Sequence, residues 1–205
     1  MPGRSVRGVH LAAAIATCLS LAQSATADPL HKVGSADAYQ HEDSGWLFPR
    51  ELGGFSRVVL PYTIDGNNDV GARYERVAEG VRSTVAVDIY AADSAAAAAK
   101  REGAKAAVQR GADPAAIVRV VSEEPFSIAA QRGLDGIKVT FAVDGPDGRS
   151  QALLYFVGTE RWTVSIAAFL SAETAPAVEA IDRFVRDQPW HTLGSDPPDL
   201  HGARR

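Results

Sequence analysis

Apolar and polar residues alternate most clearly over 81–91, where Val85, Val87 and Ile89 lie two positions apart. This spacing places the three side chains on one face of an extended strand. Two preceding stretches are rich in β-branched and aromatic residues, which also favour strands, and turn-forming residues separate the segments. We therefore expect three consecutive antiparallel strands over 56–62, 72–77 and 81–91, with turns at 65–69 and 79–80.

The pattern then changes to one typical of a helix. Residues 95–110 are rich in alanine and carry charges, Asp93 or Ser94 can cap the start, and Gly111 can end the helix. Small side chains allow a helix to sit close to a sheet, so we expect a docked structural helix. The small residues that share one stripe are Ala96, Ala99, Gly103, Ala106 and Ala107.

Four further strands follow a short apolar run at 117–121. In one of them, Ile137, Val139 and Phe141 alternate with polar residues, and the turn sequence 144–148 comes next. Strands joined by such short polar turns are antiparallel neighbours. The four strands are expected over 126–131, 137–143, 151–157 and 162–169.

A second helix is predicted over 175–186. Thr174 is a suitable N-cap, and Pro176 is tolerated in the first turn. The apolar stripe of this helix consists of Val178, Ile181, Phe184 and Val185.

This order of elements predicts an α+β fold, in which two main helices pack on an antiparallel β-sheet of six or seven strands. The connections between strands are too short for the crossovers of a parallel sheet. We expect a single domain over 46–190. Residues 28–45 are polar and without periodicity, which indicates a flexible leader, and 191–205 are expected to form a disordered tail.

The first 27 residues have the pattern of a signal peptide. Arg4 and Arg7 precede an apolar run at 9–21, which is shorter than the roughly 20 residues that span a bilayer. Small residues at 25–27 predict cleavage between Ala27 and Asp28. A lipoprotein signal is the alternative, with Cys18 acylated, although Thr17 is bulkier than the residue usually found before such a cysteine.

Removal of the signal would leave 178 of the 205 residues, enough for one domain with a core. The formal net charge would fall from −4 to −6, because the signal carries two arginines and no acid. This balance argues against nucleic acid as a partner. The single cysteine lies in the signal, so no disulfide is expected. Arginine outnumbers lysine 17 to 4, and with the signal this favours a periplasmic or secreted bacterial protein without a transmembrane segment in its mature chain.

Candidate metal and cofactor sites are weak. None of the mature histidines has the close spacing of helical metal ligands, and we expect all four to lie outside the core. Residues 65–69 begin like a calcium loop, but Arg76 stands where a bidentate glutamate belongs. We expect no metal and no cofactor. The four histidines are His31, His41, His191 and His201.

Catalytic motifs are also lacking. No serine lies in a Gly-x-Ser-x-Gly motif, and the segment from Gly133 to Gly136 is too short for a phosphate loop and precedes a strand. Two carboxylate pairs, Glu123 with Glu124 and Asp144 with Asp147, are better explained as loop and turn residues than as acid–base pairs. No catalytic residue is therefore assigned.

Aromatic residues lie at the expected edges of the elements, where they can either cap the core or line a partner or ligand groove. Core capping is the simpler interpretation. The five residues are Trp46, Phe48, Phe55, Trp162 and Trp190.

Over 46–190 the chain resembles the Mog1/PsbP-like fold group, and within it the exported bacterial LpqN-like proteins. The residues that carry the resemblance are Gly54-Phe55, the strand 81–91 before the alanine-rich helix, Gly133 to Gly136, Arg161 to Ile166, and Pro189-Trp190. The resemblance implies a domain that acts by binding, and it transfers no functional residue.

Three functions follow from the sequence as expectations. The first is an exported, non-enzymatic accessory domain that binds a protein or a cell-envelope component through a face or edge of its sheet. The second is a carrier of a small apolar ligand, which would need an enclosed cavity of about 300 Å³ or more. The third is a hydrolase with a dispersed site, which would need a histidine, a serine and a carboxylate within hydrogen-bond reach.

Overall fold

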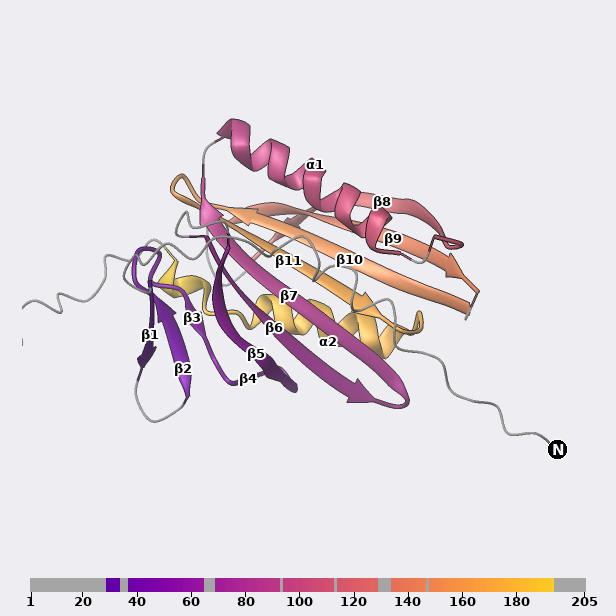
Figure 1. Ribbon diagram of the computed structural model, residues 1–205, viewed down its shortest axis with the longest axis horizontal. Coiled ribbons are helices and arrows are strands. Elements are labelled where there is room, and N and C mark those ends of the chain that lie inside the picture. The colour runs from indigo at the N-terminus through magenta and orange to yellow at the C-terminus, as the bar shows by residue number, and fades with distance from the viewer. Residues whose placement is uncertain are drawn as a thin grey trace, which may run out of the picture.

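A computed structural model describes residues 29–33, 37–64, 69–92, 94–112, 114–128, 134–146 and 148–193. Its main feature is an eight-stranded antiparallel sheet in the order β4-β5-β6-β7-β11-β10-β9-β8 (Figure 1). The strands are β4 (Glu51–Leu52), β5 (Phe55–Ile64), β6 (Asp69–Ala78), β7 (Val81–Ala91), β8 (Ile117–Ser127), β9 (Asp135–Gly145), β10 (Gly148–Gly158) and β11 (Trp162–Leu170).

The two helices, α1 (Ser94–Gly111) and α2 (Ala175–Arg186), pack on opposite faces of this sheet. Strand β10 shows this, because successive side chains of a strand point to opposite faces. Leu153 and Tyr155 belong to the large core that includes α2. Leu154 and Phe156 belong to a second, smaller core that includes Val108 of α1. Figure 1 shows α1 over the β8–β10 half of the sheet.

The expected α+β class is confirmed at the level of an antiparallel sheet with two helices, but the strand count is higher than predicted. Strand β8 joins the apolar run 117–121 to the strand expected from 126, across Glu123, Glu124 and Pro125. These residues break the apolar pattern, yet β8 is an edge strand, where a proline need not donate to a ladder.

The stripe predicted for helix α1 is only partly correct, since Ala106 and Ala107 are partly buried but two other members are not. Ala104 and Val108 contact the second core, whereas Ala99 and Gly103 are exposed. The residues at positions i and i+4 share a helix face, and the larger apolar side chain of Val108 sets which face is buried.

Helix α2 has the bounds expected from its sequence. Thr174 is at the N-cap but makes no side-chain capping hydrogen bond. Ile181, Phe184 and Val185 are buried as predicted, and Val178 is partly buried against the same core. The short helix η2 (Trp190–Thr192) follows.

The sequence predicts a flexible leader over 28–45, but the described part of this segment contains β-strands. Three short strands form a separate antiparallel sheet, here called the small sheet: β1 (Leu30–Val33), β2 (Ala38–His41) and β3 (Leu47–Phe48). Strands of two to four residues are too short to show a period, and tertiary contacts stabilise them. Leu30, Trp46 and Phe48 are buried in the large core.

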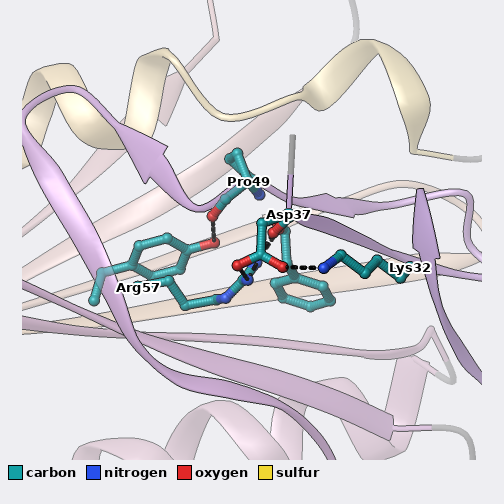
Figure 2. A network of polar contacts seen from close by, with 6 residues as sticks. Lys32, Asp37, Pro49 and Arg57 are labelled. Carbon is teal, nitrogen blue, oxygen red and sulfur yellow. Dashed lines mark hydrogen bonds and ion pairs between the residues drawn. The ribbon is translucent and has the colours of Figure 1, made fainter. Parts of the chain in front are cut away.

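Arg57 of β5 attaches the small sheet to the main sheet (Figure 2). Its side chain is only 2% exposed, and its guanidinium donates hydrogen bonds to the carbonyl oxygens of Phe48 and, at 2.7 Å, of Asp37. It also lies 4.9 Å from the centre of the Tyr39 ring. Lys32 pairs with the Asp37 carboxylate at 2.7 Å. The contacts of the buried Arg57 side chain with β3, Tyr39 and Asp37 therefore hold the small sheet in place.

Several sequence-based predictions fall on residues outside the described part of the chain. These are the signal peptide with its cleavage site between Ala27 and Asp28, Cys18, and the part of the expected disordered tail (191–205) from 194 onward. The first two residues of that expected tail lie in the short helix η2. In the part that is described, no helix has the length and apolar character needed to cross a membrane.

Candidate functional site

Among the described residues, α1 covers the sheet face opposite α2 only at the β8–β10 end. On β7, Val85, Val87 and Ile89 are buried towards α2, so the alternate residues Thr84 and Ala86 point to the opposite face. Both are partly exposed. We call this part of the sheet, formed by β5, β6, β7 and β11, the open face.

A shallow depression of about 130 Å³ lies on the open face. A volume of this size accommodates about one benzene-sized group. Apolar side chains from β7 and β11 contribute to the lining, together with Arg73 and Glu75 of β6. The depression is lined by Val58, Val59, Arg73, Glu75, Thr84, Ala86, Ala167 and Phe169, with Tyr74 and Val85 of the same strands.

Exposed valines line this depression or lie on the strands that form it. Val58 and Val59 of β5 are 52% and 41% exposed, and Val77 of β6 is 65% exposed. Val59 pairs with Arg73 in the sheet, and two register shifts interrupt the β5–β6 ladder on either side of Val59. Such bulges, with Pro61 in the same strand, oppose the addition of another strand at this edge. Docking is therefore favoured on the face rather than at the backbone edge.

Polar groups gather at the other end of the open face, around Gly71. A Cβ at Gly71 would lie 2.4 Å from Asp88 Oδ1 and 3.2 Å from the Tyr62 hydroxyl. Burial raises the pKa of Tyr62, and the Asp88 carboxylate adds to this, whereas the charge and hydrogen bond of Arg73 oppose it. The phenol therefore stays neutral at ordinary pH, where it can donate and accept hydrogen bonds but is not a base.

The candidate histidines are not brought together. His31 lies in β1 and His191 is exposed in η2, whereas His201 lies outside the described residues. His41 is fully buried, so the expectation that every mature histidine lies outside the core is wrong. Among the described residues, no three His, Cys, Asp or Glu side chains are arranged to hold a metal ion.

His41 and Ser44 form the pair closest to a hydrolase arrangement, but they are inaccessible. The His41 Nδ1 atom lies 2.7 Å from the Ser44 Oγ atom, which also accepts a hydrogen bond from the Trp46 backbone N–H at 3.2 Å. Both side chains are fully buried. A substrate therefore cannot reach Ser44 in this state. The hydrogen bonds of Ser44 instead stabilise the turn between β2 and β3.

Of the two carboxylate pairs, the described residues include both members only of Glu123 with Glu124. Glu123 and Glu124 lie in β8 rather than in a loop, and neighbouring strand residues point to opposite faces. Asp144 pairs with Arg119 and, at 3.3 Å, with Arg149. Asp147 lies outside the described part.

The five edge aromatics belong to the core, as the simpler interpretation holds. Each of them is buried in the large core. The Trp46 ring packs edge-to-face on that of Trp190, with centroids 5.1 Å apart. The partner or ligand groove considered for these residues is not formed by them.

Sequence reasoning missed the residues that do form the open face. The alternation over 81–91 already placed Thr84 and Ala86 opposite the apolar positions, which was the usable signal. What the sequence could not show is which half of that face α1 covers, because this depends on the strand order.

Comparison of the chain with models of known protein families and with curated proteins gives no match.

Proposed function

We propose that this protein is an exported, non-enzymatic binding domain, and that the open face receives a protein partner. The observation that carries this proposal is a depression lined partly by exposed valines, on a part of the sheet that no described helix covers. Protein interfaces commonly combine an apolar centre with a polar rim. The open face has this composition, because apolar Val59, Ala86 and Phe169 lie near polar Arg73 and Glu75.

The size of the depression favours a partner that inserts one apolar side chain. Hot spots of interfaces are single anchors in well-packed pockets, and about 130 Å³ suits one such group. Ligand pockets for small molecules are usually about 300–1,000 Å³ and enclosed. The carrier of a small apolar ligand is therefore the less well supported alternative.

Export is the part of the proposal that rests on residues 1–27 alone. The resemblance to the Mog1/PsbP-like group supports a role in binding, and it is consistent with an antiparallel sheet carrying two helices. The expected partner is a protein or another component of the cell envelope, and we propose a protein.

Site-specific photo-cross-linking tests the proposal. A cross-linking residue replaces Thr84 on the open face or, as a matched control, Val121, which is 64% exposed on β8 at the opposite edge. Exposed to a cell-envelope extract, the position 84 probe is expected to give one discrete protein adduct. An excess of the unlabelled wild-type domain should suppress this adduct, and an unlabelled Ala86→Arg domain should not. Equal adducts from both positions, or equal competition by both domains, would contradict the proposal.

A further inference from the structure

The turn that follows β2 is held against the main sheet by His41. The ring of His41 packs edge-to-face on that of Trp162, at the start of β11, with centroids 5.4 Å apart and an interplanar angle of 86°. The His41 backbone N–H donates to the Trp46 carbonyl at 2.9 Å. This single residue therefore contacts the small sheet on one side and the main sheet on the other.

Only one of the two ring nitrogens of His41 has a hydrogen-bond partner. Nδ1 is bonded to Ser44, whereas Nε2 is buried without a partner among the described residues. A neutral imidazole needs one donor and one acceptor contact, but an imidazolium has two N–H donors. Protonation in place would leave a charged ring in an apolar environment with an N–H that has no acceptor, and burial of such a group is costly.

The charged groups around His41 do not reverse this preference. Glu42 and Asp43 in the adjoining turn, and Asp69 at the start of β6, favour the protonated ring through their charge, but burial outweighs them and holds the pKa of His41 below its ordinary value of 6.5. The neutral ring is the form that fits the closed structure.

We propose that the small sheet is an acid-sensitive flap, seated while His41 is neutral and released at its His41 end when this ring takes up a proton from the solvent. Release hydrates the imidazolium and uncovers the aromatic surface of Trp46 and Trp162. Arg57 keeps the flap attached, because its bonds to the Phe48 and Asp37 carbonyls involve no group that titrates near neutral pH.

The direction of the pH dependence follows from the two states. In the open state His41 titrates near its ordinary value of about 6.5, and in the closed state it titrates lower. The closed state is therefore favoured above pH 6.5 and is progressively lost below it. One proton raises the opening equilibrium by at most about tenfold between pH 7.5 and pH 5.5.

Hydrogen exchange of the full chain, corrected for the intrinsic pH dependence of exchange, tests this flap. Opening of 38–48 relative to 151–170 is expected to rise from pH 7.5 to 5.5 in wild type, by at most about tenfold. His41→Gln is expected to lose this response, and His191→Gln, which changes an exposed histidine, is expected to keep it. A response that is absent in wild type, or equal in wild type and His41→Gln, would overturn the proposal.

A second measurement does not depend on how well the variant folds. NMR titration of ¹³C-labelled histidines in wild type is expected to show His41 in its neutral form until the opening transition begins, below pH 6.5. If His41 instead titrates at or above 6.5 while the small sheet stays protected, the proposal fails.

Discussion

The Tyr155 hydroxyl donates a 2.5 Å hydrogen bond to Oδ1 of Asp182, which joins the interior strand β10 to helix α2. The same oxygen accepts a 2.8 Å hydrogen bond from Lys138 of β9. The Tyr155 side chain is fully buried, and those of Lys138 and Asp182 are 13% and 19% exposed. This contact holds α2 against β9 and β10, on the face of the sheet opposite α1.

Replacement of Asp182 should destabilise the domain. In Asp182→Ala the phenol and the ammonium both lose their acceptor in a largely buried position, and the free energy of unfolding should fall by about 3 kcal/mol. Urea unfolding measures this change. Glu179→Ala, at an exposed position of the same helix, should change it by less than about 0.5 kcal/mol. Equal effects of the two substitutions would show that the contact contributes nothing.

The buried tyrosine predicts an alkaline limit of stability. Burial raises the pKa of Tyr155, and the bond to Asp182 adds to this. Because the folded-state value is raised, the stability from the neutral phenol is complete below about pH 10 and is lost as the pH rises above it. Tyr155→Phe should therefore leave the tyrosinate absorbance of the folded protein unchanged and reduce only the increase that accompanies alkaline unfolding. A reduced absorbance before unfolding would contradict this account.

Two glycines should respond oppositely to alanine. A Cβ at Gly136 of β9 would lie 1.9 Å from the Phe156 carbonyl oxygen, whereas a Cβ at Gly103 of α1 has no neighbour within 4 Å. Gly136→Ala should lower the free energy of unfolding by about 3 kcal/mol because backbone must move. Gly103→Ala should raise it by up to about 1 kcal/mol through helix propensity. Thermal unfolding of both variants tests the geometry, and a tolerated Gly136→Ala would show that it is wrong.

The attachment of the small sheet should depend on the guanidinium of Arg57. A lysine at this position keeps the charge but cannot bind both carbonyls in the same geometry. Arg57→Lys should cost about 2 kcal/mol and make 29–48 sensitive to limited proteolysis. Arg50→Lys, at an exposed position, is the matched control. If 29–48 stays protected in Arg57→Lys, the attachment has another source.

Local pattern was sufficient for the elements with long, regular sequences. The strand 81–91 and the helix 175–186 have their expected bounds, because each carries an apolar face that can be recognised without its neighbours. Pattern failed in β8, where Glu123, Glu124 and Pro125 interrupt the apolar residues, since an edge strand tolerates polar side chains and proline.

Long-range contacts explain most of what the sequence could not predict. Arg57 contacts a polar segment that resembles a leader in its sequence, and the buried ring of His41 packs on Trp162, which is far away in the chain. The open face depends on a strand order that places β7 beside β11. Each of these contacts joins residues that are far apart in the sequence, so the local sequence pattern cannot predict it.

Binding measurements with two arginine substitutions test the central claim most directly. Ala86→Arg fills the depression on the open face, and Val121→Arg adds the same side chain at the opposite edge of the sheet. Titration calorimetry with the partner identified by cross-linking should show a loss of at least about 1.4 kcal/mol, a tenfold weaker affinity, for Ala86→Arg, and wild-type affinity for Val121→Arg. Undiminished binding by Ala86→Arg, with its fold intact by circular dichroism, would contradict a partner site on the open face.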